Sequence, residues 1–332
     1  MTGGGSFEVG EAFLAGWASV AGPHEAEGPL GAAFDEVWSD ELNGEDSWER
    51  AERALSLEAL DRAATRAAIT REDLDAVLAG DLLDQLYATN FAGRDHQRPL
   101  LGLFAACATF TEGIGLAALL LGNGGPRALG VVASSHHLAA ERQFRFPVEF
   151  GYQRPLTASW TATAAGAVVV SRKEGPVRVR SVTWGRVTDR GSKNPMDMGT
   201  AMAPAAHDTI SRHLQFSGHA VDDYDRIVTG DLGHVGSAIL QDLMGNPEGW
   251  QKRHDDCGRS LYHERQDSHN GGSGAGCVAA VTCARVLPEL AAGRWRRVLV
   301  VATGALFSPT SYQQGETIPC IAHAVELEAV EG

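Results

Sequence analysis

The chain has 332 residues, of which 44% are hydrophobic and 21% are charged, so its composition is that of a globular protein and excludes disordered and fibrous classes. Its formal net charge of −14 offers no basic surface to a phosphate backbone, and we expect no nucleic-acid partner. Because the sequence has neither a basic N-terminal leader nor an apolar run of about 18 residues, no signal peptide or transmembrane helix is predicted. The five cysteines form no CxxC pair, so we expect reduced thiols in a soluble protein of the cytoplasmic type.

The N-terminal region carries many glycine, proline and acidic residues, above all over Gly22–Trp48. These residue types favour turns and loops. We therefore predict an irregular lead-in over residues 1–48, followed by an amphipathic helix over Glu49–Ala67.

The chain then begins to repeat itself. The segment Thr70–Asp81 returns as Ala220–Asp231, 150 residues later. Each copy has a helical stretch, a polar turn and a short apolar run that ends in Gly-Asp, which is typical of a buried parallel strand.

A second pair of segments follows the first pair in the same order. An apolar helical stretch over Cys107–Leu121 leads to a predicted strand over Ala128–Ala133. In the second copy, Gly276–Leu290 leads to a predicted strand over Arg297–Ala302. The repetition predicts two similar halves, each with a mixed sheet, packed back to back across buried helices.

Two further predicted strands, Ala165–Ser171 and Val177–Thr183, close the first sheet and lead into the second half. We therefore expect an α/β protein with an N-terminal half over residues 1–175 and a C-terminal half over 176–332, together forming one compact unit. The segment Gly185–Ala206 is predicted to be a long loop that covers a pocket.

Cys107 stands between an apolar run and the first turn of a long predicted helix. Backbone N–H groups and the helix dipole favour negative charge at such a position, so a thiolate or an anionic ligand would be stabilised there. The alternative interpretation is a buried structural cysteine, which is common for a free thiol.

The segment Ala105–Phe110 resembles the nucleophile segment of thiolases and ketoacyl synthases, and the duplication resembles their thiolase-like fold, a five-layered αβαβα arrangement. From about Ala21 to Glu328, the chain more closely resembles the stage V sporulation protein AD family, a thiolase-like family of spore-forming bacteria. The strings that carry this resemblance are Gly28–Gly31, Ala79–Leu83, Ala140–Pro147, Met198–Ala206, His254–Gly258, Gly271–Gly274 and Glu316–Pro319.

That family belongs to the machinery that loads dipicolinic acid, usually as its calcium chelate, into the developing spore and releases it at germination. The resemblance implies binding of this ligand, with calcium entering only as part of the chelate and no other cofactor. It also implies association with the membrane-embedded proteins of the spore stage V A system and a peripheral position on the spore inner membrane. It further implies a homodimer that pairs through the strand after the Cys107 helix.

Condensing enzymes of this fold supplement their cysteine with histidine and asparagine, or with histidine and a second cysteine. At the matching places this chain has Thr229–Leu232 and Gly271–Gly274, which contain neither histidine nor asparagine, and Ala302–Leu306 lacks a cysteine. Since each missing group typically contributes about 100-fold in rate, we expect Cys107 to be a vestigial nucleophile. A shift of register that brings Asn270 or His234 to the sulfur remains an alternative.

Two other functions stay open. The first is an acyltransferase of the thiolase or ketoacyl synthase type that uses Cys107, and the second is a scaffold that docks on a membrane channel and has a vestigial pocket.

A flat aromatic dianion needs cationic or N–H donors and apolar walls. Arg142, or else Arg145, would pair with a carboxylate and Phe146 or Phe144 would stack on the ring, unless the arginines form ordinary surface ion pairs. Asp81 and Asp231 would either bind calcium or cap turns. His323 would either line the site or pack within its strand. The predicted ligand-binding residues are Cys107, Asp81, His136, Arg142, Phe146, Asp231, Gly272, Ser273 and His323, with no catalytic residue and no resident metal.

Overall fold

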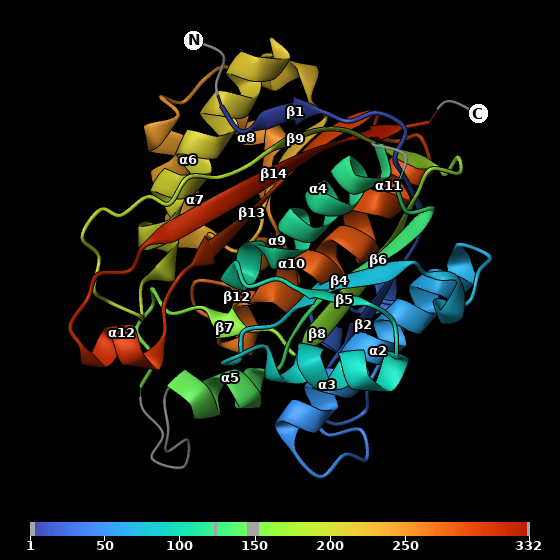
Figure 1. The fold of residues 1–332 in the computed structure, drawn as a ribbon. Helices are drawn as coiled ribbons and strands as arrows, with labels where there is room; N and C mark the ends of the chain where they lie inside the picture. The colour runs from blue at the N-terminus through green and yellow to red at the C-terminus, as the bar shows by residue number, and fades with distance from the viewer. Residues whose placement is uncertain (1–3, 123–124, 145–152, 331–332) are drawn as a thin grey trace.

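The computed structural model describes residues 4–122, 125–144 and 153–330 (Figure 1). The strands are β1 (Ser6–Glu8), β2 (Phe13–Ala21), β3 (Glu36–Val37), β4 (Ala76–Gly80), β5 (Leu100–Gly102), β6 (Ala128–Ser135), β7 (Trp160–Thr161), β8 (Ala164–Ser171), β9 (Val177–Thr183), β10 (Arg226–Thr229), β11 (His254–Asp256), β12 (Gly272–Ser273), β13 (Arg297–Ala305) and β14 (Cys320–Ala329). The α-helices are α1 (Pro23–Ala26), α2 (Trp48–Arg66), α3 (Tyr87–His96), α4 (Thr109–Gly122), α5 (His137–Phe144), α6 (Met198–Ser217), α7 (Gly233–Leu243), α8 (Trp250–Arg253), α9 (Cys257–Leu261), α10 (Ala275–Val281), α11 (Leu287–Ala291) and α12 (Pro309–Gln313). Short helical turns include η3 (Ala106–Ala108) and the π-helical η7 (Thr282–Val286).

The strand order confirms the predicted duplication. The strands follow the path β11-β10-β13-β14-β9-β2-β8-β6-β4-β5, so each half contributes five strands in the same relative order. In each half four strands share one direction (β2, β4, β5 and β6; β9, β10, β11 and β13), and a single strand, β8 or β14, runs antiparallel to its two neighbours. The halves join where β2 pairs with β9 through two residues of each strand. The boundary at residues 175 and 176 stays a prediction.

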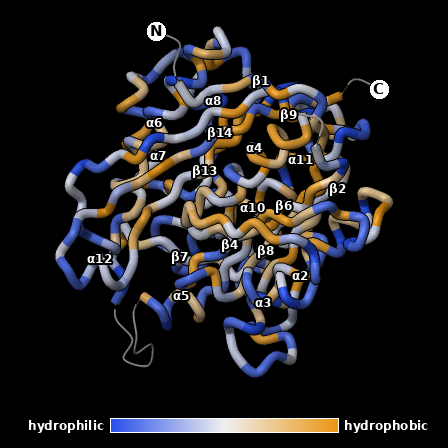
Figure 2. Tube along the Cα trace, in the orientation of Figure 1, coloured by the Kyte–Doolittle hydropathy of each residue, from blue (hydrophilic) through white to orange (hydrophobic). Residues whose placement is uncertain are grey.

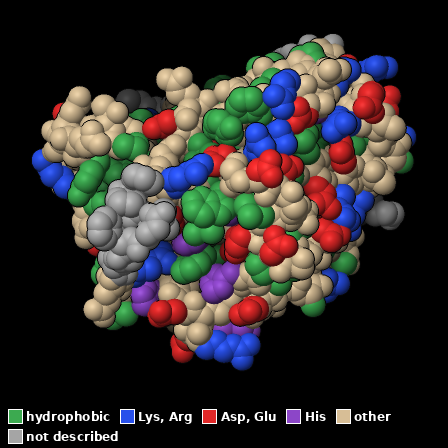
Figure 3. Space-filling model, turned by 90° about the horizontal axis from the view of Figure 1, so that it is seen from below, with side chains coloured by type: hydrophobic (Ala, Val, Ile, Leu, Met, Phe, Trp, Pro, Cys, Tyr) green, Lys and Arg blue, Asp and Glu red, His purple; other side chains and the backbone are tan. Residues whose placement is uncertain are grey.

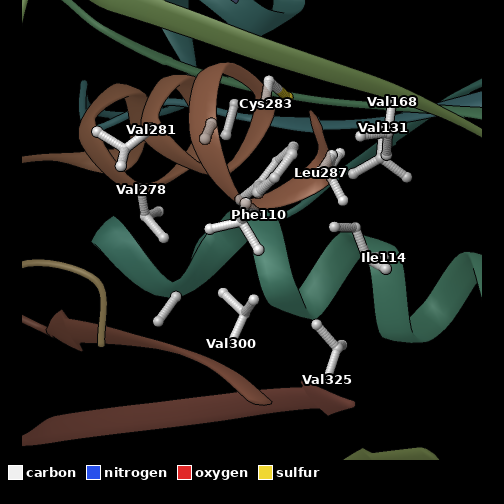
Figure 4. Packing of buried hydrophobic residues seen from close by; sticks show 14 of the residues in the cluster. Phe110, Ile114, Val131, Val168, Val278, Val281, Cys283, Leu287, Val300 and Val325 are labelled. Atoms are coloured by element: carbon white, nitrogen blue, oxygen red, sulfur yellow. The ribbon is translucent and has the colours of Figure 1, made fainter. Parts of the chain in front are cut away.

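Two buried helical stretches, α4 and the continuous run of α10, η7 and α11, lie between the two sheets (Figures 1 and 4). A helix that is apolar on all sides must be buried, and α10 has this composition, while α4 is apolar except for Glu112 and its threonines. Figure 2 shows hydrophobic residues concentrated along these central helices and the strands beside them. The shared core contains Phe110, Ile114, Val131, Val168, Val278, Val281, Leu287, Val300 and Val325.

The outer faces of the sheets are covered by one long helix each. Helix α2 buries Leu55, Leu60 and its alanines against β2, β6 and β8. Helix α6 buries Met202 and Ile210 against β13 and β14. The order is therefore helix, sheet, helices, sheet, helix, which confirms the predicted five-layered αβαβα arrangement.

Two expectations about segments of the chain were wrong in detail. Residues 1–48 are not irregular throughout, because Phe13–Ala21 forms the central strand β2, whose glycine and alanines weaken the sequence signal for a strand. The predicted long loop ends at Asp197, whose side chain caps α6 by accepting a hydrogen bond from the Thr200 backbone N–H at 3.4 Å.

The strand after the Cys107 helix, β6, cannot pair with a second copy of the chain. It lies inside the sheet, with β4 on one side and β8 on the other, so both of its edges are occupied. Strands β5 and β11 lie at the two ends of the strand path. The homodimer itself stays a prediction. None of the helices in the described part of the chain is long and apolar enough to cross a bilayer.

Candidate functional site

Cys107 lies in η3, the tight turn that opens helix α4. Its neighbour Ala106 has a φ of 50°, a left-handed conformation that side chains other than glycine seldom adopt. The Thr109 hydroxyl closes the turn, since it donates to the Ala106 carbonyl at 2.8 Å and accepts from the Ala105 N–H at 3.2 Å. A Cβ at Gly304 would lie 2.2 Å from the Ala105 carbonyl oxygen, so β13 of the second half packs directly on this turn.

The side chains that interact with the sulfur in the described part of the chain, Ser273 and Asp231, come from the second half. Ser273 in β12 places its Oγ 4.0 Å from Cys107 Sγ and donates to Asp231 Oδ2 at 2.7 Å. Thr303 in β13 donates to Asp231 Oδ1 at 2.8 Å. Cys107, Asp231, Ser273 and Thr303 are called the Cys107 group below. Its centre is the carboxyl group of Asp231, which accepts hydrogen bonds from both hydroxyls.

The electrostatics of the Cys107 group favour a neutral thiol. Burial raises the pKa of Cys107 well above its ordinary value, and the negative charge of Asp231 raises it further. Burial also raises the pKa of Asp231, while hydrogen bonds from Ser273, Cys107 and Thr303 oppose that shift. Burial and the charge of Asp231 both oppose ionisation of Cys107, and the thiolate is the form in which a cysteine attacks.

A second buried carboxyl, Asp256, fixes the turn that carries Asp231. It accepts hydrogen bonds from the Thr229 hydroxyl at 2.6 Å and from the backbone N–H groups of Leu232 and Gly233 at 3.0 Å each. Burial raises the pKa of Asp256 to about 7, and the charge of Asp231 adds to the shift. These hydrogen bonds to Asp256 fix the turn and therefore the orientation of Asp231.

Asn270 and His234, the two residues of the alternative register, lie away from the sulfur. Asn270 uses its amide to hold α7, accepting from the Val235 N–H at 2.7 Å and donating to the Leu232 carbonyl at 3.2 Å and to Ser159 Oγ at 3.0 Å. The His234 side chain is exposed. Among the described residues, no imidazole or side-chain amide lies within hydrogen-bonding distance of Cys107 Sγ.

His323 is a packed strand residue. Its Nδ1 accepts from the Gly185 N–H at 3.0 Å, and its ring meets Trp184 edge-on at 5.6 Å. Burial lowers the pKa of His323 to about 4, so its imidazole is neutral at physiological pH. The structure does not bring it into the Cys107 group.

Asp81 and His136 also lie apart from the Cys107 group. Asp81 accepts from the backbone N–H groups of Leu83 at 2.8 Å and Thr89 at 2.7 Å, which is the turn-capping alternative. His136 is fully buried, and its Nε2 lies 2.8 Å from the Glu41 carbonyl oxygen, so its ring points into the lead-in.

Arg142 forms an ion pair with Glu49, and its guanidinium lies 5.3 Å from the centre of the Trp48 ring. It lines a groove of about 690 Å³ between α2, α3 and α5, at the end of the molecule where Figure 3 shows acidic and basic side chains interspersed. Arg142 therefore forms the surface ion pair that was the alternative to pairing with a ligand carboxylate. Arg145 and Phe146 lie outside the described residues.

Gly272 and Ser273 lie in β12, a two-residue strand that pairs in parallel with Trp160 and Thr161 of β7. Successive side chains on a strand point to opposite faces. Ser273 therefore faces Asp231, whereas a Cβ on Gly272 would lie 3.2 Å from Tyr262 Cε2 on the other face. Gly272 allows close packing and does not reach the sulfur.

The described residues contain no group of three or more His, Cys, Asp or Glu side chains that could hold a metal ion. Calcium as part of a bound chelate stays a prediction. Thr303 is the member of the Cys107 group that the sequence prediction missed. Its signal is a hydroxyl directly after the apolar run of β13, at a strand end expected to meet the site.

A second buried polar cluster, which the sequence prediction also missed, joins the two halves of the chain. Glu25 is fully buried and accepts hydrogen bonds from the Tyr262 hydroxyl and, at 3.1 Å, from the Thr163 N–H. The Thr163 hydroxyl donates to Glu41 Oε2 at 2.9 Å. Burial raises the pKa of Glu25 to about 7.

This shift predicts how Glu25 affects stability. A carboxyl whose pKa is higher in the folded chain stabilises the fold below its unfolded pKa, and that contribution is lost as the pH rises through about 7. Relative to wild type, Glu25→Gln is therefore expected to gain about 2 to 3 kcal/mol in unfolding free energy between pH 5 and pH 8. Urea unfolding of both proteins at the two pH values measures this difference. A difference that does not change with pH would show that Glu25 ionises normally.

Sequence comparisons place these features in context. The family described as stage V sporulation protein AD matches residues 7–328. The chain is 45% identical over 317 residues to the stage V sporulation protein AD of Bacillus subtilis (strain 168), which covers 95% of this chain and 93% of that protein.

Solved structures show the same fold at low sequence identity. A variant of OleA from Xanthomonas campestris bound with cerulenin superimposes with a TM-score of 0.62 at 17% identity, covering 97% of each chain. The 3-oxoacyl-[acyl-carrier-protein] synthase III of Aquifex aeolicus gives a TM-score of 0.59 at 13% identity, covering 96% of this chain and 99% of that chain. These likenesses confirm the thiolase-like fold.

Proposed function

Because the chain belongs to the stage V sporulation protein AD family, we propose that it binds dipicolinic acid or its calcium chelate at the Cys107 group without converting it chemically. In this role it serves uptake of the acid into the developing spore and its release at germination. It would act together with the membrane-embedded proteins of the spore stage V A system, attached peripherally to the spore inner membrane.

The observation that carries the non-catalytic role is the carboxylate beside the sulfur. A condensing enzyme lowers the pKa of its cysteine and places donors where negative charge develops. Here Asp231 raises the pKa of Cys107, and Ser273 Oγ is 4.0 Å from the sulfur. Both features oppose formation of a thiolate and of an acyl intermediate.

The Cys107 group offers a ligand one accessible polar contact. Asp231 and Thr303 are fully buried and Cys107 is 9% exposed, whereas Ser273 is half-buried. A ligand that reaches this site therefore meets the Ser273 hydroxyl first. The Arg142 groove, which is lined by side chains of α2, α3 and α5, is the competing location for an anion.

Calorimetric titration with dipicolinate, with and without calcium, tests the proposal. We expect saturable binding to wild type and binding about tenfold or more weaker in Ser273→Leu, because the larger side chain occupies the position of the hydroxyl. Arg142→Ala is the matched control and should bind within about twofold of wild type. Absence of binding, or unchanged binding in Ser273→Leu, would contradict the proposal, as would an acyl adduct on Cys107 after incubation with acyl-CoA.

A further inference from the structure

The hydrogen bonds around Asp231 have a fixed direction while this carboxyl is ionised. A carboxylate only accepts hydrogen bonds, so each neighbour must donate. Ser273 Oγ donates to Oδ2 at 2.7 Å, Thr303 Oγ1 donates to Oδ1 at 2.8 Å, and the Gly274 N–H donates to Oδ2 at 3.3 Å. With the Cys107 thiol these make four donors around one buried carboxyl, and all four favour its ionised form.

This arrangement makes Ser273 a poor partner for an anion. A serine hydroxyl has a single hydrogen, and here that hydrogen is committed to Asp231. The accessible side of Ser273 therefore presents lone pairs, with a negative charge directly behind them. An incoming carboxylate would meet only repulsion at this point.

One added proton removes the conflict. A protonated carboxyl has one O–H donor, so a proton on Asp231 Oδ2 can be donated to Ser273 Oγ across the same 2.7 Å. The Ser273 hydrogen is then free to turn toward the ligand. The hydrogen bonds from Thr303 and Gly274 keep their direction, since they need only lone pairs on the carboxyl oxygens.

Resting on the proposed function, we infer that binding of an anionic ligand at Ser273 is coupled to uptake of one proton from solvent by Asp231. Proton uptake reverses the hydrogen bond between Asp231 and Ser273, which turns Ser273 from an acceptor into a donor. The site therefore selects anions that arrive together with a proton, and ligand is released as the proton leaves.

The groups that face Asp231 favour this protonation. Cys107 comes from η3, Ser273 and Gly274 from the region of β12, and Thr303 from β13, and none of these side chains carries a positive charge. The carboxyl of Asp256 lies on the inner side and interacts repulsively with Asp231. Further titratable neighbours that feel the charge of Asp231 are Cys257, Cys277 and Cys320. Burial raises the pKa of Asp231, which brings protonation within reach of a bound anion.

The test is calorimetric titration of the full chain with dipicolinate at pH 7.5 in phosphate, HEPES and Tris. The acid is fully ionised at this pH, so the slope of observed enthalpy against buffer ionisation enthalpy counts the protons taken up by the protein. We expect about one proton per ligand, and a Kd that weakens about tenfold per pH unit above the pKa of Asp231.

Asp231→Asn should bind with no proton uptake and with a Kd that does not depend on pH, because the amide already supplies an N–H donor. Asp81→Asn, at the corresponding strand end of the first half, is the matched control and should retain the uptake. Binding to wild type with no uptake, or uptake that persists in Asp231→Asn, would overturn this inference and leave the proposed function intact. Absence of dipicolinate binding to the wild-type chain would contradict both the proposed function and this inference.

Discussion

Asp231→Asn is expected to raise the rate of Cys107 alkylation about tenfold or more at pH 8.5. The Asp231 carboxylate raises the pKa of the thiol through its charge and through a hydrogen bond, and repulsion between two like charges at short range is on the order of 4 kcal/mol at an effective dielectric of about 20. Since 1.36 kcal/mol corresponds to about one pKa unit, even partial loss of this repulsion raises the thiolate fraction tenfold. Iodoacetamide labelling followed by peptide mass spectrometry measures the rate at Cys107.

Asp81→Asn serves as the control for this measurement. Asp81 occupies the corresponding strand end of the first half, but its carboxylate caps the turn at Leu83 and Thr89. Its replacement should leave Cys107 labelling unchanged. If wild-type Cys107 reacted as fast as a free thiol, or if Asp231→Asn had no effect, the carboxylate would not be what suppresses the nucleophile.

Gly166→Ala is expected to cost about 3 kcal/mol of unfolding free energy. Gly166 lies in β8 where the strand meets helix α10, and an added Cβ would lie 2.3 Å from the carbonyl carbon of Ala279. This neighbour is backbone in the central layer and can move only if the sheet and the helix separate. Overpacking of this kind typically costs about 1 to 3 kcal/mol.

Urea unfolding of the variant and of Gly10→Ala measures this effect. Gly10 has open space around it, because the nearest atom to an added Cβ is 3.9 Å away. The control should therefore stay within about 0.5 kcal/mol of wild type. Equal midpoints for the two variants would show that the contact between β8 and α10 is loose.

Most of the fold could be predicted because its elements depend on local patterns. The apolar runs of β6 and β8 are buried along their length, as parallel or central strands require, and the repeated Gly-Asp ends mark β4 and β10 in both halves. Strand β2 was missed because Phe13–Ala21 mixes glycine and alanine with larger residues, and its strand conformation depends on pairing with β8.

The composition of the Cys107 group could be predicted only in part. Asp81 and Asp231 follow the same Gly-Asp pattern, yet Asp231 alone faces the sulfur, while Asp81 turns back onto its own loop. Arg142 stands in a segment with the positive charge and aromatic residues that binding of an aromatic acid requires. In the structure, however, its guanidinium pairs with Glu49 and lies over the Trp48 ring. The choice between such alternatives depends on neighbours that are distant in the chain.

The amino-acid order alone was enough to specify the duplicated α/β architecture, the helix that starts at Cys107 and the lack of histidine and asparagine at the expected catalytic positions. Each of these follows from periodicity or residue identity within short segments. Folding alone brings Ser273, 166 residues away, within 4.0 Å of Cys107, and turns Asp231 toward both. The physical reason is that the two sheets close on α4 and α10, and the packing of β13 on the Cys107 turn selects which strand ends meet the sulfur.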